Sequence, residues 1–125
     1  MAKKILIIED EEILLNLLKN KFSEIGYEVS IATDGVLGLK AMKEILPDLV
    51  LLDLVMPKMG GFELLEKRQE DETINGIPII IISNSGQPVE LGRAKELGVN
   101  DWLIKTEFDP KEVIQKVVAQ IGESN

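Results

Sequence analysis

Charged and hydroxyl side chains directly follow the aliphatic runs of this sequence. The residues at these positions are Glu9, Asp10, Asp53, Ser83 and Lys105. Carboxylate oxygens bind hard cations, and an ionised aspartate can attack phosphorus as a nucleophile. A hydroxyl and an amine can offset the charge on the oxygens of a phosphoryl group. The set therefore indicates phosphoryl chemistry beside a bound cation, provided that the fold brings these side chains together.

The three carboxylates of Glu9, Asp10 and Asp53 predict a metal ion. Carboxylates that share a crevice repel one another, and a divalent cation removes that cost. The chain has no histidine and no cysteine, so a metal has to be held by oxygen. Mg²⁺ suits such a site, because it takes one or two carboxylates together with waters and phosphate oxygens. We therefore expect Mg²⁺ as the cofactor.

Asp53 is the candidate nucleophile, assisted by Lys105 and Ser83. An aspartate is ionised at neutral pH and needs no general base. Lys105 would act as a point charge on one phosphoryl oxygen, and Ser83 would donate a hydrogen bond to another. Taken singly, an acidic pair often caps a helix, a serine is a loop hydroxyl and a lysine is a solvated charge. Their shared position after predicted strands favours one site.

Five segments have the composition of β-strands. Three are almost purely aliphatic, which is typical of strands buried on both faces of a parallel sheet. One alternates apolar with polar residues and another is short, which indicates edge strands. In chain order the five segments are residues 5–8, 27–31, 49–52, 79–82 and 102–104.

Helical patterns alternate with these strands and carry start or stop signals. The third helix is expected around Phe62 and Leu65, and the polar residues 69–76 are expected to form a surface loop. The signals of the other four are Gly26 after the first helix, Asp34 before the second, Pro88 and Gly98 around the fourth, and Asp109-Pro110 before the fifth.

This alternation predicts an α/β fold, a doubly wound five-stranded parallel sheet flanked by five helices. Ligands bind such sheets outside the carboxyl ends of the strands, where the strand order reverses. All the candidate residues follow strands, so we expect them in one crevice. The length fits one domain, residues 1–125.

Charge and hydropathy argue against several classes of partner. The net charge of −8 opposes nucleic acid and anionic membrane surfaces, so we expect direct binding to neither. No apolar run approaches the length of a membrane span, and the amino-terminal segment is too short for a signal peptide. A cytoplasmic location is therefore expected.

At this point the sequence resembles the receiver domain of bacterial two-component response regulators, from about residue 3 to 121. The resemblance implies a flavodoxin-like sheet of strand order 2-1-3-4-5. The matching residues are Glu9-Asp10, Leu51-Leu52-Asp53-Leu54-Val55-Met56-Pro57, Gly60-Gly61, Ser83 and Asn100-Asp101-Trp102-Leu103-Ile104-Lys105.

The resemblance assigns a role to each residue of the site. It implies that Asp53 receives a phosphoryl group from a histidine kinase, a phosphotransfer protein or a small donor such as acetyl phosphate. Asp10, Asp53 and the backbone carbonyl of Val55 would ligate Mg²⁺, and Glu9 would act through water. It implies a phospho-acceptor regulatory protein rather than an enzyme, with self-phosphorylation from donors and self-dephosphorylation.

The resemblance also implies an output mechanism. Ser83 would move towards the phosphoryl group and Trp102 would turn inward, changing a face built from the fourth helix, the fifth strand and the fifth helix, which a downstream protein reads. Trp102 is equally well explained as a static core anchor. Both interpretations are open at this stage.

Three positions depart from the family pattern. Thr106 follows Lys105, where most receivers have a proline after a cis peptide bond. A cis bond before a non-proline residue costs about 2.5 to 4 kcal/mol. We therefore predict a trans bond and a rearranged loop at 106–109. Asn84 replaces a small residue, and Val55 offers no polar side chain to orient a water. We expect altered, slow loss of the phosphoryl group.

Other functions fit the sequence less well. A degenerate receiver that acts as an interaction module without phosphorylation is the main alternative. A phosphohydrolase would need a second acid close after Asp53, where Leu54 and Val55 stand. A flavodoxin-like cofactor carrier would need a phosphate-binding loop after the first strand, where residues 9–12 are all acidic. We expect no output domain within the 125 residues, and the sequence does not decide between a free regulator, a phosphorelay intermediate and part of a longer chain.

Overall fold

A computed structural model describes residues 2–84, 86–99, 101–106 and 109–124. Its five strands form one parallel sheet of order β2-β1-β3-β4-β5, which confirms the predicted fold class. The short and the alternating segments are the edge strands, as expected. The strands are β1 Lys4–Ile8, β2 Glu28–Ala32, β3 Leu49–Asp53, β4 Ile79–Ser83 and β5 Asp101–Ile104.

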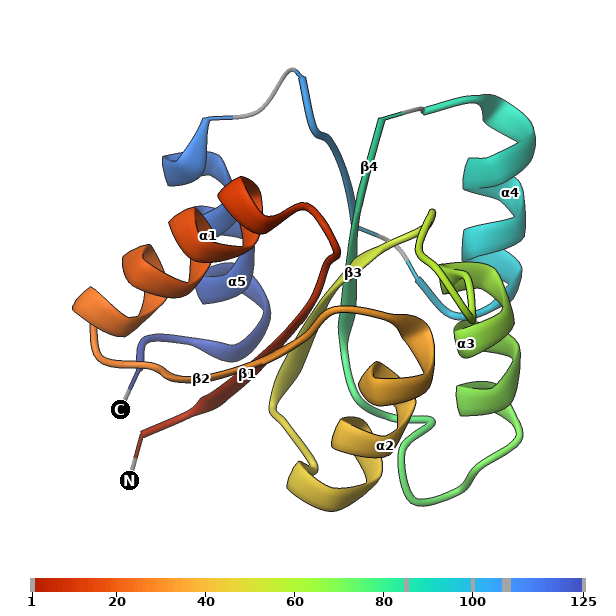
Figure 1. Ribbon diagram of the computed structural model, residues 1–125, viewed down its shortest axis with the longest axis horizontal. Coiled ribbons are helices and arrows are strands. Elements are labelled where there is room, and N and C mark those ends of the chain that lie inside the picture. Colours follow the sequence, from red (N-terminus) through yellow and green to blue (C-terminus); the bar gives the residue numbers. More distant parts are fainter. Residues whose placement is uncertain (1, 85, 100, 107–108, 125) are drawn as a thin grey trace.

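Five helices cover the two faces of this sheet. Helices α1 and α5 lie on one face, and α2, α3 and α4 lie on the other (Figure 1). None of the helices in the described residues has the length and hydropathy of a membrane span. The helices are α1 Glu12–Glu24, α2 Gly35–Ile45, α3 Gly61–Gln69, α4 Pro88–Glu96 and α5 Pro110–Ile121.

The aliphatic strands divide their side chains between two hydrophobic layers. Every residue of β3 and β4 is buried, because helices cover both faces of these central strands. Along β1, Ile5 and Ile7 pack towards α1 and α5, whereas Leu6 and Ile8 pack towards α2, α3 and α4. This two-residue period fixes the strand register and therefore the position of each strand end.

Helix boundaries follow the predicted caps. The Asp34 carboxylate accepts a hydrogen bond from the backbone of Leu37 at 2.8 Å, and Asp109 accepts one from Lys111 at 2.7 Å. Gly26 and Gly98 have φ angles of 100° and 85° just after α1 and α4, where a left-handed residue ends a helix. Sequence signals thus located the helix ends closely.

Two predicted segments need correction. Strand β2 runs from Glu28 to Ala32, one residue later than expected, because Tyr27 turns into the core and its hydroxyl donates to the Gly122 carbonyl at 2.7 Å. Residues 69–76 are not wholly a surface loop: Gln69 ends α3, and Ile74 is completely buried.

Arg68 is an unexpected buried cation in the last turn of α3. Its guanidinium donates to the carbonyl of Ile77 at 2.7 Å and to that of Leu97 at 3.2 Å. Burial lowers the pKa of Arg68, because the side chain is cut off from water. The contacts tie α3 to the start of β4 and to the end of α4.

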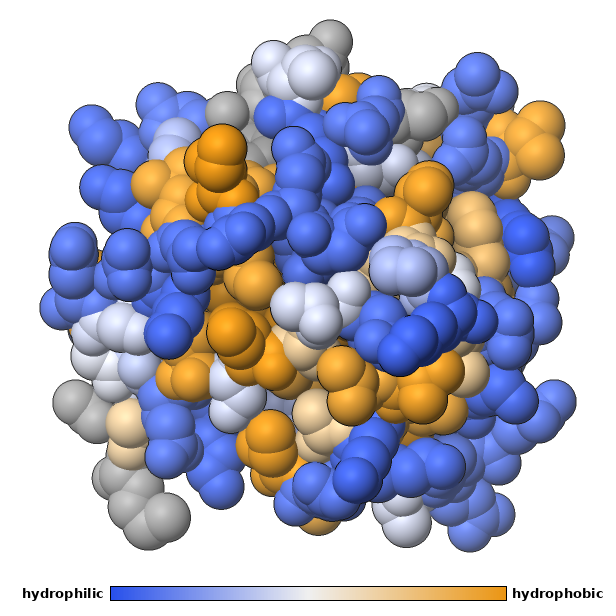
Figure 2. All heavy atoms as spheres, viewed as in Figure 1, coloured by the Kyte–Doolittle hydropathy of each residue, from blue (hydrophilic) through white to orange (hydrophobic). Residues whose placement is uncertain are grey.

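Some large hydrophobic side chains remain in contact with solvent. Figure 2 shows them gathered across the middle of the visible face, between hydrophilic borders, and Figure 1 shows α1, β2 and α2 on that side. The exposed hydrophobic residues of these elements include Ile13, Leu17, Ile31 and Leu37. The edge strand β2 is thus only partly covered by its flanking helices.

Candidate functional site

Three carboxylates meet where β1 and β3 end. Ile8 pairs with Leu52 in the sheet, so the residues that follow them lie side by side. Glu9, Asp10 and Asp53 each offer a carboxylate oxygen, and these oxygens lie within 4.8 Å of one another. Glu9 and Asp53 are only 2% and 4% exposed, whereas Asp10 faces solvent. The order β2-β1-β3 makes this the point where strand order reverses.

Lys105 carries its amine into the carboxylate cluster from the end of β5. Its backbone nitrogen donates to the Ser83 carbonyl at 2.8 Å, which extends the pairing of β4 with β5. The side chain is 8% exposed, and Nζ lies 2.9 Å from Glu9 Oε1 and 3.4 Å from Asp53 Oδ2. Lys105 is therefore not a solvated surface charge.

Glu11 is a partner of Lys105 that sequence reasoning missed. Its Oε2 accepts a hydrogen bond from Lys105 Nζ at 2.8 Å, although the Glu11 side chain is 61% exposed. The backbone nitrogen of Glu11 also donates to Glu9 Oε2 at 2.9 Å. In the sequence Glu11 is one of four consecutive acids, which gave no reason to separate it from Glu12.

Burial dominates the electrostatics of the crevice. It raises the pKa of Glu9 to about 7, and the charge on Asp53 adds to this while hydrogen bonds from Glu11 and Lys105 oppose it. Burial also raises the pKa of Asp53, against the charge of Lys105. Burial alone would lower the pKa of Lys105, but hydrogen bonds to Glu11 and Glu9 and the charge on Asp53 raise it overall. The carboxylates are crowded enough to favour a further positive charge.

The loop after β3 is held close to Asp53 by two glycines. Val55 lies on it with an exposed side chain, and its backbone nitrogen makes a long hydrogen bond of 3.5 Å to Asp53 Oδ1. A Cβ on Gly61 would lie 2.7 Å from the Asp53 carbonyl oxygen, and a Cβ on Gly35 would lie 2.1 Å from that of Met59. Only glycine permits these approaches of α3 and α2.

Ser83, Asn84 and Thr106 lie at or just after the carboxyl ends of β4 and β5, and Trp102 lies within β5. Ser83 is the last residue of β4 and is buried, and Asn84 after it is exposed. Trp102 is half-buried and packs against the layer under α2, α3 and α4. No peptide bond in the described part of the chain is cis, so the predicted trans bond from Lys105 to Thr106 is confirmed. Asn100 and residues 107–108, with the predicted loop change, lie outside the described residues.

The donor set fits Mg²⁺. All three clustered groups offer oxygen, the ligand that hard cations prefer. Glu9 Oε1 is buried and lies at ion-pair distance from Lys105, but it has no aligned hydrogen bond. A buried carboxylate oxygen without such a bond is satisfied by a cation or by a water bound to one.

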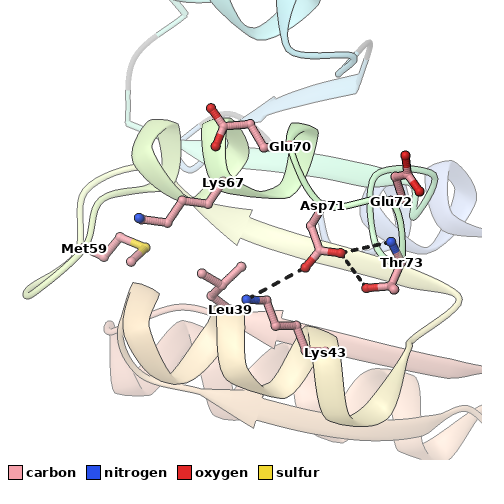
Figure 3. Close-up of a pocket in the computed structure, with 8 residues that line it drawn as sticks. All are labelled: Leu39, Lys43, Met59, Lys67, Glu70, Asp71, Glu72 and Thr73. Atoms are coloured by element: carbon pink, nitrogen blue, oxygen red, sulfur yellow. Dashed lines mark hydrogen bonds and ion pairs between the residues drawn. The ribbon is translucent and has the colours of Figure 1, made fainter.

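A separate hollow lies between α2 and α3 (Figure 3). It measures about 590 Å³, and Leu39 and Met59 contribute its apolar part. Asp71 in this hollow already pairs with Lys43 at 3.8 Å and accepts from the Thr73 hydroxyl at 2.6 Å. None of the clustered carboxylates lines it, so the crevice rather than this hollow is the candidate site.

Comparison with known proteins agrees with the fold. The family model described as response regulator receiver domain matches residues 5–118. The chain is 36% identical to the Regulator of RpoS of Escherichia coli over 95% of this chain and 35% of that protein. It is 33% identical to the alkaline phosphatase synthesis transcriptional regulatory protein PhoP of Bacillus subtilis, over 99% of this chain and 50% of that protein.

Solved structures show the same architecture. A CheY-like response regulator receiver domain protein from Methanospirillum hungatei superposes with a TM-score of 0.89 at 26% identity, covering 97% of this chain and 94% of that one. The receiver domain of the Francisella response regulator 1452 gives 0.85 at 28% identity, covering 95% and 96%.

The chain belongs to the response regulator receiver domain family, as its resemblance predicted. The general function of this family is that of a phosphoryl-accepting regulatory switch. The chain spans about a third to a half of the curated relatives named above, so their whole-protein activities do not transfer to it.

Proposed function

We propose that Asp53 accepts a phosphoryl group and that the chain is a signalling switch rather than an enzyme. The observation that carries the proposal is the position of the Lys105 amine, 3.4 Å from a nearly buried Asp53 carboxylate within a cluster of oxygen ligands. An amine beside a carboxylate nucleophile offsets the charge that develops on the phosphoryl oxygens.

Asp10, Asp53 and the backbone carbonyl of Val55 would hold Mg²⁺, with Glu9 acting through water. When bound, Mg²⁺ would neutralise the clustered carboxylates and the charge of the incoming phosphoryl group. The clustered oxygens of Glu9, Asp10 and Asp53 support this assignment.

The chain's own residues would perform the transfer. An Asp53 oxygen forms the new bond to phosphorus while the donor's bond to phosphorus breaks, and the electron pair of that bond leaves with the donor. Lys105 binds one phosphoryl oxygen and Ser83 donates to another. The nucleophile is a carboxylate, so no side chain has to remove a proton first.

The partners follow from this chemistry and from the family. A histidine kinase or a phosphotransfer protein would supply the phosphoryl group, and a downstream protein would read α4, β5 and α5. Ser83 ends β4 and Trp102 lies on β5, a strand of that face, which supports this assignment. We propose no direct nucleic-acid or membrane contact, a cytoplasmic location, and one receiver domain over residues 1–125.

Incubation with acetyl phosphate and Mg²⁺, followed by intact-mass measurement, tests the proposal. The wild type should gain one phosphoryl group, and Asp53→Asn should gain none. Asp48→Asn is the matched control and should be modified like the wild type, since Asp48 accepts from the Lys4 backbone at 2.7 Å outside the crevice. An unmodified wild type would indicate a degenerate receiver that acts as an interaction module.

A further inference from the structure

The shortest contacts of the Lys105 amine are with Glu11 and Glu9 rather than with the proposed phosphoryl acceptor. Nζ donates to Glu11 at 2.8 Å and to Glu9 Oε2 at 3.2 Å. Asp53 Oδ2 is the most distant of its carboxylate partners in the described residues, at 3.4 Å. An ammonium has three donors, so every strong partner competes with the others for its position.

Glu11 differs from the other two partners in exposure. Glu9 and Asp53 are held in the buried crevice, whereas Glu11 approaches the amine from solvent with a side chain that is 61% exposed. A solvated carboxylate can leave without being stranded in a dry site, which a buried carboxylate cannot do. Glu11 is therefore the partner that Lys105 can exchange for a phosphoryl oxygen.

We propose that Glu11 is a positioning residue that draws the Lys105 amine away from Asp53 and so slows phosphoryl transfer to Asp53. The inference rests on the proposed function of Asp53. Transfer requires an Nζ donor to turn towards the phosphoryl group, and the hydrogen bond to Glu11 has to weaken for that to happen. Glu11 thus sets how readily this chain accepts a phosphoryl group.

Glu11→Gln tests the contact with little change of shape. A neutral amide accepts a hydrogen bond about half as strong as a carboxylate does, so the amine is released more easily. We expect phosphorylation by acetyl phosphate to become about fivefold faster, equivalent to about 1 kcal/mol at 1.36 kcal/mol per tenfold. Glu12→Gln is the matched control, because Glu12 is exposed, carries the same charge and begins α1; its rate should stay within about twofold.

A second pair of measurements separates the contact from simple repulsion of an anionic donor. Glu11→Asp keeps the charge but shortens the reach by one methylene, and it should also accelerate the reaction. The faster phosphorylation of Glu11→Gln should persist at 1 M salt, where repulsion between charges more than about 3 Å apart is largely screened. The same acceleration relative to wild type should be seen with phosphoramidate, a less charged donor.

The outcomes are distinct. A wild type that is never phosphorylated removes the proposed function itself. If the wild type is phosphorylated but Glu11→Gln is no faster, or Glu12→Gln is equally fast, or the gain disappears in high salt, the role of Glu11 is overturned while that of Asp53 stands.

Discussion

Replacing Gly35 by alanine should weaken Mg²⁺ binding from outside the metal site. Gly35 begins α2, and an added Cβ would lie 2.1 Å from the backbone oxygen of Met59 and 2.8 Å from its carbonyl carbon. Ordinary contacts begin near 3.4 Å, so helix and loop must separate by roughly 1 Å. The third close atom is the Met59 Cβ at 2.7 Å, which is fixed to the backbone, so no flexible end of a side chain can relieve the contact by moving aside.

The substitution should affect both the free energy of unfolding and the affinity for Mg²⁺. Overpacking of this kind typically lowers the free energy of unfolding by about 1 to 3 kcal/mol. The same loop carries Val55, and disturbing groups that support metal ligands lowers metal affinity by about 10- to 100-fold. We therefore expect a folded Gly35→Ala protein whose Mg²⁺ dissociation constant rises by at least about tenfold.

Calorimetric Mg²⁺ titration and urea unfolding measure the two effects. Gly92→Ala is the control, because a Cβ at Gly92 on α4 would meet nothing within 4 Å, and alanine should raise helix stability by up to about 1 kcal/mol. If Gly35→Ala binds Mg²⁺ as tightly as wild type, α2 does not brace the loop and the reasoning fails.

Three further predictions concern separate parts of the molecule. Arg68→Met should lower the free energy of unfolding by about 2 kcal/mol, since two carbonyls lose their donor. Lys67→Met, on the exposed side of α3, should change it little. An Arg68→Met protein as stable as wild type would mean that the cost of desolvating the guanidinium offsets its hydrogen bonds. Burial, with the charge on Glu123 as a second cause, raises the pKa of Tyr27 above 10.0, so its contribution to stability is present below the unfolded pKa and is lost as pH rises through the folded pKa. Tyr27→Phe should cost about 1 kcal/mol at neutral pH and converge with wild type in alkaline urea titrations; a constant difference would contradict this. Trp102 fluorescence should change on adding Mg²⁺ but not in Asp53→Asn; an identical response in both proteins would place the effect outside the crevice.

The sequence predicted the sheet and the convergence of the site residues at its edge. It did not predict how the carboxylates share the Lys105 ammonium. Strand ends are fixed by hydrophobic patterns, so the neighbourhood of Asp53 and Lys105 followed from topology. The hydrogen bond from Lys105 to Glu11 depends on the rotamers of two long side chains, and rotamers leave no periodic pattern in the sequence. The packing role of Gly35 could not be predicted either, and Gly61 was noted only as part of the family pattern, because close backbone approach is a property of the packed elements.

The Lys105 ammonium, which several carboxylates share, explains why metal and phosphoryl chemistry belong together in this crevice. Glu9, Glu11 and Asp53 pair with the amine of Lys105, and Asp10 lies in the same carboxylate cluster, so the cluster is short of positive charge even at rest. A phosphoryl group on Asp53 adds negative charge and claims that amine as well. A bound divalent cation and the release of Lys105 from Glu11 are two answers to the same deficit. If Mg²⁺ binding and the release of Lys105 both operate, Glu11→Gln should accelerate phosphorylation more at limiting Mg²⁺ than at saturating Mg²⁺. Phosphorylation rates measured across a series of Mg²⁺ concentrations test this. An equal acceleration throughout the series would show that the metal and Glu11 act independently.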